Sequence, residues 1–481
     1  MRYFNNRTDS RLVSIWERIK NSPQLNNISL DYISELATEK KLTIHKLQEV
    51  SVGSFLTIPG MLLDTDAGKV IYPKVRACSL DMYKNNVELK KEMANFWRSV
   101  DWFTPAYVTN ETIHEAFEIT GVNPRNFRQR LDSHNQKQFD YALPSIYSVG
   151  QMVLVVNQIL PNSNIIKKHL PIIRESILAF YSGMRVAAIA SLIPIMEDIL
   201  RSLVLEDEKS DNLTTNINRC IDNACMNALK MDIHNVDWIP NEFASEEFLT
   251  STNERVFILE SIRNWLLDSF YVDSSKYNKY SGFNRQHFAH ALSDIWHRNT
   301  NFFRAIGLIQ ALAFVECFAR PDSNISIFLP EPNESTKSFH IEIIASLDAQ
   351  VAKQKVLNKI KSNNAFPYNA TASDDGWLLR SALLSELMDK EIIRSLRNNG
   401  WQCIDFIDPI KDGEYITVIA NKNDKTIKIA LLYSCASSRD LYENLSIDCD
   451  FILFHGAAYH MQEYAGSVEN VYPLNAWVTP T

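Results

Sequence analysis

The sequence predicts a mainly α-helical protein with a central helical bundle, a helical N-terminal region and a small C-terminal α/β domain. The chain has 481 residues, which is too long for one hydrophobic core. Glycine occurs 13 times, where average usage of about 7% would give roughly 34, and helices need fewer glycines than turn-rich folds. Apolar residues recur at helical spacing along most of the chain, and at a period of two only near the C-terminus.

The composition describes a globular protein without a global basic surface. Hydrophobic residues make up 46% and charged residues 22% of the chain, so disorder is not expected. The formal net charge is −8, which argues against a long surface that wraps a nucleic-acid duplex. A small local site for single-stranded RNA is compatible with this charge.

Cysteine usage and hydropathy favour a soluble cytoplasmic protein. The seven cysteines are scattered and form no C-x-x-C pair, so neither a disulfide framework nor a zinc site is indicated. Residues 1–12 lack the apolar segment of a signal peptide. The stretches 149–160 and 186–194 are apolar but fall short of the roughly 20 residues of a membrane span.

Residues 1–160 are expected to form a mostly helical N-terminal domain in which we find no chemical motif. Pro59, Gly60 and Gly68 make residues 55–72 a loop or a hairpin. Aromatic side chains such as Trp97 are expected in the core. Helices are expected at residues 11–20, 31–41, 87–100 and 110–119.

Residues 161–340 are expected to form a bundle of four or five helices that begins after the polar break at residues 161–164. Pro194 should kink one of these helices. Polar loops are expected at residues 206–215 and 235–252, on either side of a further helix. The other helices are expected at residues 165–181, 185–203 and 254–270, with one or two more within 283–318.

Residues 341–375 are expected to supply a charged connecting helix and a polar linker, and residues 376–481 an α/β domain. A helix at residues 377–398 should end at Gly400, a typical C-cap residue. Strands are then expected at residues 401–407, 415–420, 426–433 and 451–454, with a short helix near 437–445.

The most informative segment is Phe-Asn-Arg-Gln-His-Phe-Ala-His-Ala-Leu at residues 283–292. It resembles the HEPN superfamily, whose metal-independent ribonucleases carry an Arg and a His four to six residues apart at the start of a late helix. Here four residues separate Arg285 from His290. The helix expected at 185–203 resembles the earlier core helix of the family, and its Glu197 matches the acidic residue often found there. The resemblance covers about 150 residues.

This resemblance implies catalytic roles for Arg285 and His290. Histidine titrates near neutral pH and suits a general base or acid in RNA cleavage. A guanidinium stabilises the negative charge that develops on the phosphoryl oxygens. Five residues along a helix amount to roughly 500°, so the two side chains do not share one face. Related proteins dimerise, which implies a homodimer with a composite site.

Four further residues are candidate supporting groups. Asn284 and Gln286 are polar neighbours of Arg285, His287 lies within the motif, and Glu197 is expected to orient Arg285 or His290. The chain departs from the family at two places. Many members have Asn directly after the Arg and Gly after the His, where this sequence has Gln286 and Ala291.

The C-terminal block resembles the restriction-endonuclease-like fold in the order of its elements. Active members hold magnesium with an Asp and a Glu-x-Lys motif. Asp412 matches the first position, but Thr426 stands two places before Lys428 where Glu is expected. We therefore expect a degenerate domain kept for recognition or assembly. The spacing of Asp448, Asp450, His455 and His460 is more typical of a solvated loop than of a metal site.

Two hypotheses follow. The first is an endoribonuclease of HEPN type that needs no metal or cofactor, takes RNA as substrate, and acts as a toxin or anti-phage defence effector. A regulatory protein or a phage-derived trigger would then control it. The second is a catalytically inactive HEPN interaction protein whose C-terminal domain binds a partner or nucleic acid.

Overall fold

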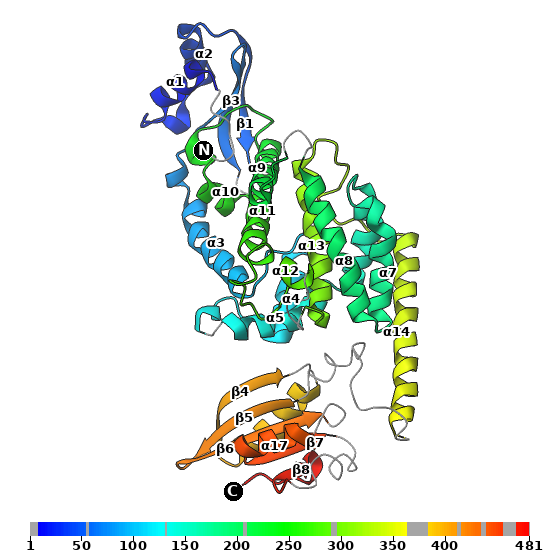
Figure 1. Ribbon diagram of the computed structural model, residues 1–481. Helices are drawn as coiled ribbons and strands as arrows, with labels where there is room; N and C mark the ends of the chain where they lie inside the picture. Colours follow the sequence, from blue (N-terminus) through cyan, green and yellow to red (C-terminus); the bar gives the residue numbers. More distant parts are fainter. Residues whose placement is uncertain are drawn as a thin grey trace. The chain divides into compact units, whose positions relative to one another are not determined.

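The computed structural model divides the chain into two compact units. One contains residues 1–182 and 187–348, and the other contains residues 183–186 and 349–481. The structure describes residues 8–53, 57–129, 132–204, 209–289, 296–362, 383–410, 415–433, 439–455 and 468–480. Helices dominate the described part, together with one three-stranded and one five-stranded sheet (Figure 1). The prediction of a mainly α protein is confirmed.

The first unit begins with two helices and a small antiparallel sheet in the order β1-β2-β3. The hairpin expected within residues 55–72 is formed by β2 and β3, but β1 was not predicted. A shift in register between Ile44 and Lys46 interrupts the alternation of side chains that marks a strand. The elements are α1 (Ser10–Ile19), α2 (Leu30–Glu39), β1 (Ile44–Val52), β2 (Ile58–Thr65) and β3 (Gly68–Pro73).

The rest of this unit is helical. The helices predicted at residues 185–203 and 254–270 are confirmed, the second with a wider final turn. Residues 235–252 were expected to be a loop, and this was wrong for α10, which the Ser245 side chain caps by accepting the Phe248 N–H at 3.2 Å. The helices are α3 (Asp81–Ser99), α4 (Asn110–Thr120), α5 (Asp132–Ile146), α6 (Val149–Leu154), α7 (Leu170–Tyr181), α8 (Arg185–Leu203), α9 (Leu213–Asp232), α10 (Glu246–Thr252), α11 (Glu254–Trp265), α12 (Arg285–Ala289), α13 (Asn299–Ala319) and α14 (Glu334–Ser362).

Helix α13 forms the centre of the unit and is buried along almost its whole length (Figure 1). Its polar side chains contact residues on the N-terminal side, Arg304 through an ion pair and Gln310 and Glu316 through hydrogen bonds, because a buried polar group without a partner is costly. The contacts are Arg304 Nη2 to Asp140 Oδ1 at 2.7 Å, Gln151 Nε2 to Gln310 Oε1 at 2.8 Å, and Asn164 N to Glu316 Oε1 at 3.1 Å. The boundary expected near residue 160 therefore falls inside one continuous core.

In the described part of the chain, α13 alone is a single helix long and apolar enough to cross a membrane. It has 21 residues, and its most apolar window of 18 residues has a mean hydropathy of 1.7 and is 89% buried in protein. Residues 132–146 and 149–162 pass the same test only together, and a bend of 55° separates them. A buried core helix of a soluble protein has the composition that α13 shows.

The second unit contains a five-stranded sheet in the order β4-β5-β6-β7-β8. The first three strands are antiparallel, and β7 and β8 each run parallel to the strand before. The four predicted strands are confirmed, whereas the three-residue β8 was not predicted. The elements are α16 (Arg394–Asn398), β4 (Gln402–Ile410), β5 (Tyr415–Lys422), β6 (Lys425–Tyr433), α17 (Arg439–Asp448), β7 (Phe451–His455) and β8 (Val471–Pro473).

Gly307 tests how tightly α13 is packed. A Cβ atom at this position would overlap the ring of Tyr147, whose hydroxyl oxygen would lie 2.6 Å away. That hydroxyl accepts the indole N–H of Trp102 at 3.0 Å in the core, so the ring has little freedom to move. We expect Gly307→Ala to lower the free energy of unfolding by about 1–3 kcal/mol, measured by urea denaturation.

Gly150→Ala is the matched control for this substitution. A Cβ there would have its nearest neighbour, the Ser148 hydroxyl, at 3.9 Å. Alanine in α6 should leave the stability unchanged or raise it by about 0.5–1 kcal/mol. Equal stability of the two variants would contradict the tight packing of α13 against Tyr147.

Candidate functional site

Arg285 opens the short helix α12, and the buried side chain of Asn284 fixes where this helix begins. Asn284 has no exposed surface. Its carbonyl oxygen accepts the backbone N–H groups of Gln286 at 2.9 Å and His287 at 3.4 Å, as an N-cap residue does. Its amide nitrogen donates to the backbone carbonyls of Ser269, Phe270 and Val272. The buried amide of Asn284 thus joins residues 269–272, which follow α11, to the start of α12.

Asp101 anchors the loop of residues 273–282, which leads into α12. Its buried carboxylate accepts the hydroxyls of Tyr277 at 3.2 Å and Ser281 at 2.8 Å. The backbone carbonyl of Asp101 also accepts the indole N–H of Trp265 at 3.1 Å. Burial raises the pKa of the Asp101 carboxyl above its usual value. Asp101, which belongs to the N-terminal region, therefore fixes the loop that leads to Arg285.

Arg285 forms an ion pair with Glu197 of α8, through its Nε and a carboxylate oxygen. The hydrogen bond to Glu197 raises the pKa of Arg285 above its ordinary value. The guanidinium carbon lies 5.7 Å from the centre of the Tyr271 ring, a cation–π distance. Among the described residues, the two terminal nitrogens of Arg285 have no hydrogen-bond partner. They remain available for an anionic ligand.

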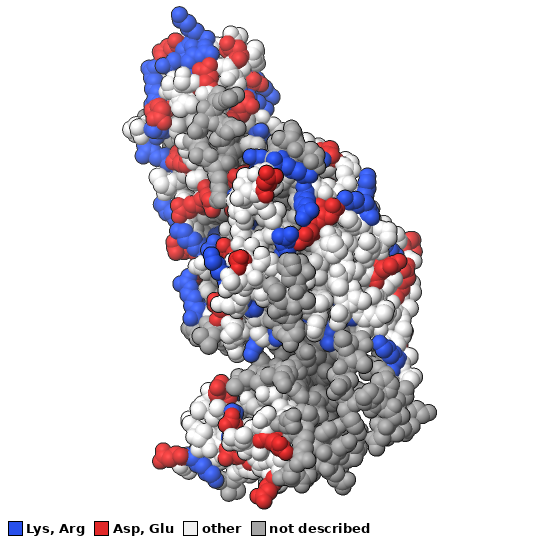
Figure 2. All heavy atoms as spheres, in the orientation of Figure 1, with Lys and Arg blue, Asp and Glu red and all other residues white. Residues whose placement is uncertain are grey.

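The Arg285–Glu197 pair lies in an open cleft of about 350 Å³. Three basic and two acidic side chains line it, so cations exceed anions locally although the chain as a whole is acidic. Across the face seen in Figure 2, blue and red side chains lie beside one another rather than forming one positive surface. The lining residues are Glu197, Leu200, Arg201, Lys209, Ser210, Asp211, Leu213, Asn216, Tyr271 and Arg285.

The structure brings together one pair of the predicted site residues, Arg285 and Glu197. Glu197 was expected to orient Arg285 or His290, and its contact is with Arg285. His290 lies outside the described residues, as does Ala291. The helices on either side of this gap, α12 and α13, lie where one or two helices were predicted within residues 283–318, and α13 ends at Ala319.

The other supporting candidates have structural contacts and are not among the residues that line the cleft. The side-chain oxygen of Gln286 accepts the backbone N–H of Ser274 at 2.9 Å, which holds the preceding loop. The ring of His287 packs edge-on against Tyr277, with ring centres 5.2 Å apart. Together with the buried Asn284, these side chains shape the turn that presents Arg285.

Sequence reasoning did not identify Arg201 or Lys209 as lining residues of the cleft. Arg201 lies one helical turn after Glu197, and its Nη2 is 3.8 Å from the Glu197 carboxylate. The spacing of four residues on a predicted helix is a signal that was available for this pair. Lys209 reaches the cleft from the segment between α8 and α9, and no periodic pattern marks such a position.

The candidate metal site of the C-terminal unit receives no support from the described residues. Asp412 and His460 lie outside them. The Asp450 carboxylate accepts the backbone N–H of Lys428 at 2.7 Å, and the Asp450 N–H donates back to the Lys428 carbonyl at 2.9 Å. Asp450 therefore fixes the point at which β7 begins to pair with β6. No cluster of three or more potential metal ligands occurs within the ranges that the structure describes.

Asn284→Ala tests the turn that presents Arg285. It removes the cap of α12 and leaves three carbonyls without their donor, so we expect the free energy of unfolding to fall by about 1–3 kcal/mol. Backbone amides of residues 285–289 should also exchange faster with deuterium. Asn162→Ala is the control, since Asn162 is exposed and its amide donates only to Gln158 O at 2.8 Å. Equal behaviour of the two variants would overturn the role of Asn284.

The chain matches no family model, no curated protein and no solved structure. The resemblance to the HEPN superfamily accordingly stands on residues of this chain alone, namely the Arg285 to His290 spacing and the helices around it.

Proposed function

We propose that this protein is a metal-independent endoribonuclease of the HEPN type. The observation that carries the proposal is the position of Arg285. Its guanidinium is held from one side by Glu197, keeps its terminal nitrogens available, and lies in an open cleft with more basic than acidic side chains. A planar guanidinium with two adjacent N–H groups matches the oxygens of a phosphodiester.

The proposed reaction uses the substrate's own 2′-hydroxyl as the nucleophile. The 2′-oxygen loses its proton and bonds to phosphorus, while the bond from phosphorus to the 5′-oxygen breaks and that oxygen gains a proton. The products are a 2′,3′-cyclic phosphate and a 5′-hydroxyl. His290 serves in one or both proton transfers, and Arg285 stabilises the charge on the phosphoryl oxygens.

Glu197 has two roles in this account. It orients the guanidinium by bonding to Nε, which leaves the terminal nitrogens directed to a ligand. It also neutralises Arg285 while the cleft is empty, which lowers the cost of holding a partly buried cation. A bound phosphate would contact the terminal nitrogens of Arg285, while the Glu197 carboxylate stays on Nε.

The active enzyme in this proposal is a cytoplasmic homodimer with a composite site. The resemblance implies dimerisation, because related proteins dimerise so that two such helices line one cleft. The C-terminal α/β domain, taken as a degenerate restriction-endonuclease-like domain, would act in recognition or assembly. The setting suggested by the family is a toxin or an anti-phage defence effector that a regulatory protein or phage component triggers.

A second candidate function is that of a catalytically silent interaction protein. The observation that favours it is the same ion pair, because a buried or half-buried Arg–Glu contact also serves to join two helices. Here α12 would be joined to α8 by Arg285 and Glu197 with no reaction in the cleft. Dependence of RNA cleavage on both Arg285 and His290 separates the two functions.

Cleavage of a mixed pool of tRNA and mRNA in EDTA tests the proposed function. We expect Arg285→Ala and His290→Ala each to slow cleavage by about 10²–10⁴-fold while leaving the secondary structure and the oligomeric state unchanged. Arg285→Lys keeps the charge but loses the planar fork, so its rate should also fall. The control is Arg18→Ala, which removes an exposed ion pair with Glu39 outside the cleft.

Two results would contradict the proposal. Cleavage at the wild-type rate by the Arg285 and His290 variants would show that the reaction belongs to another site or to a contaminant. A wild-type protein that binds RNA or a protein partner but cleaves nothing, as dimer and with any trigger added, would support the interaction protein instead.

A further inference from the structure

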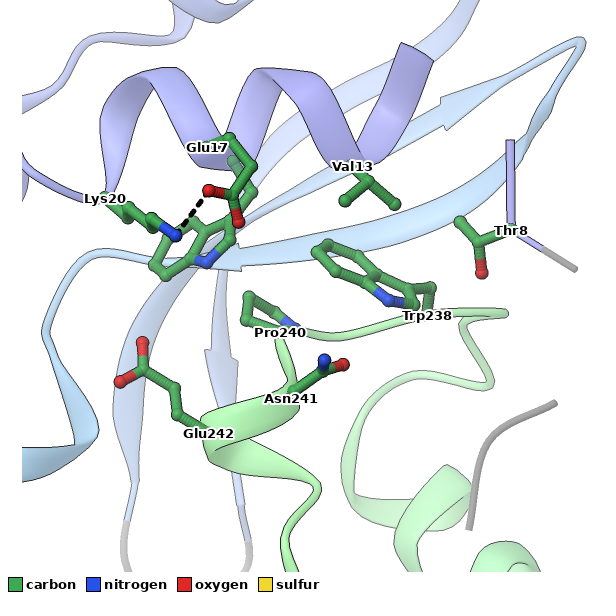
Figure 3. A pocket seen from close by; sticks show the side chains of 9 residues that line it. Thr8, Val13, Glu17, Lys20, Trp238, Pro240, Asn241 and Glu242 are labelled. Carbon is green, nitrogen blue, oxygen red and sulfur yellow. Dashed lines mark ion pairs between the residues drawn. The ribbon is translucent and has the colours of Figure 1, made fainter. Parts of the chain in front are cut away.

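A second cavity lies away from the Arg285 cleft, in the N-terminal part of the first unit. Its volume is about 500 Å³, within the range of ligand sites in proteins. Helix α1 forms one wall, and the segment of residues 238–242, between α9 and α10, forms the other (Figure 3). The cavity therefore lies where the core built on α1, α2 and the small sheet meets the main helical core.

One part of the cavity is apolar and rigid. Trp16 and Trp238 both line it while being almost fully buried, and Pro240 lies beside them. The ring of Tyr72 packs against both indoles, parallel to Trp16 and edge-on to Trp238, which holds the two rings in place. Neither indole N–H has a hydrogen-bond partner among the described residues. This wall suits an aliphatic stem.

The other part of the cavity is charged, and acidic groups outnumber basic ones there. Figure 3 shows Glu17 and Lys20 on α1 forming an ion pair, with Glu242 on the opposite wall. The C-terminal end of α1 adds partial negative charge at Lys20. The side chain of Arg76 donates to the Lys20 carbonyl at 3.2 Å, which fixes this end of the helix.

Among the residues that the structure describes, Glu242 forms no direct ion pair, and the charges of Arg76 and Lys20 act on it from a longer distance. Its surroundings raise the pKa of the carboxyl by burial, an effect that a backbone hydrogen bond from Ala77 and the charges of Arg76 and Lys20 partly offset. A cation brought to this carboxylate would stabilise its ionised form. Anions such as phosphates would meet two carboxylates, so a nucleic-acid backbone is disfavoured here.

We propose that this cavity binds a lysine or arginine side chain of a partner polypeptide. The hydrocarbon stem lies along Trp16, Trp238 and Pro240, and the terminal cation bonds to Glu242 at the charged end. Long basic side chains combine an apolar stem with a charged tip, and this cavity has an apolar wall and an acidic end in the same arrangement. The proposal is independent of RNA cleavage.

Indole N–H signals of the full-length protein, labelled with ¹⁵N-tryptophan, provide the test. The chain has nine tryptophans, and the variants Trp16→Phe and Trp238→Phe assign the two signals. The probes are N-acetyl-arginine methylamide, N-acetyl-lysine methylamide and the uncharged isostere N-acetyl-citrulline methylamide. We expect both basic probes to shift the two signals with a dissociation constant on the order of 1 mM.

Glu242→Gln should weaken binding of the basic probes by about 5-fold or more, since a charge-assisted contact is lost. Glu39→Gln is the control, because Glu39 is an exposed carboxylate on α2 that pairs with Arg18 outside the cavity. Any of three outcomes would overturn the proposal: no shift of either signal with the basic probes, equal shifts with citrulline, or unchanged binding in Glu242→Gln.

Discussion

The buried ion pair between Arg304 and Asp140 is the contact on which the arrangement of the first unit most depends. Arg304 lies in the second turn of α13 with no exposed surface, and Asp140 on α5 is its partner at 2.7 Å. Removing one member of such a pair leaves a charge buried without a partner, which costs about 3–5 kcal/mol. The pair therefore fixes α13 against the N-terminal helices, and α12 immediately precedes α13 in the chain.

The candidate site inherits its geometry from these buried polar contacts. Asp101 holds the loop before α12, and Asn284 sets the first residue of that helix. With the backbone placed, the Arg285 side chain has one anionic neighbour within reach, Glu197 on α8. The N-terminal region thus acts as a support for the cleft, a role that its own sequence did not reveal.

The sequence predicted the long apolar helices well and the polar connections poorly. Helices α8, α11 and α13 carry apolar residues over several turns, which makes their position unambiguous. The string at residues 161–164 has the composition of a linker, yet Ser163 and Asn164 bond to the buried Glu316. Such a contact depends on tertiary structure, so composition alone placed a boundary where the core continues.

The candidate site was also predictable only in part, because some of its contacts depend on tertiary structure. The spacing of Arg285 and His290 and the acidic Glu197 are visible in the sequence, and the Arg285–Glu197 contact joins two of these three. The positions of Lys209 and Tyr271 in the cleft follow from how three separate segments meet. No periodicity carries that information. The helix α10 was missed because its seven residues are too few to establish a helical period. The strand β1 was missed because a register shift between Ile44 and Lys46 interrupts its alternation.

The chemistry of the RNA ends tests the central claim most directly. Purified wild-type protein is incubated with a defined single-stranded RNA in EDTA, and the products are analysed by mass spectrometry. The account predicts fragments that end in a 2′,3′-cyclic phosphate and begin with a 5′-hydroxyl, because the substrate's own hydroxyl is the nucleophile. Fragments with a 3′-hydroxyl and a 5′-phosphate, or cleavage that requires added magnesium, would contradict it.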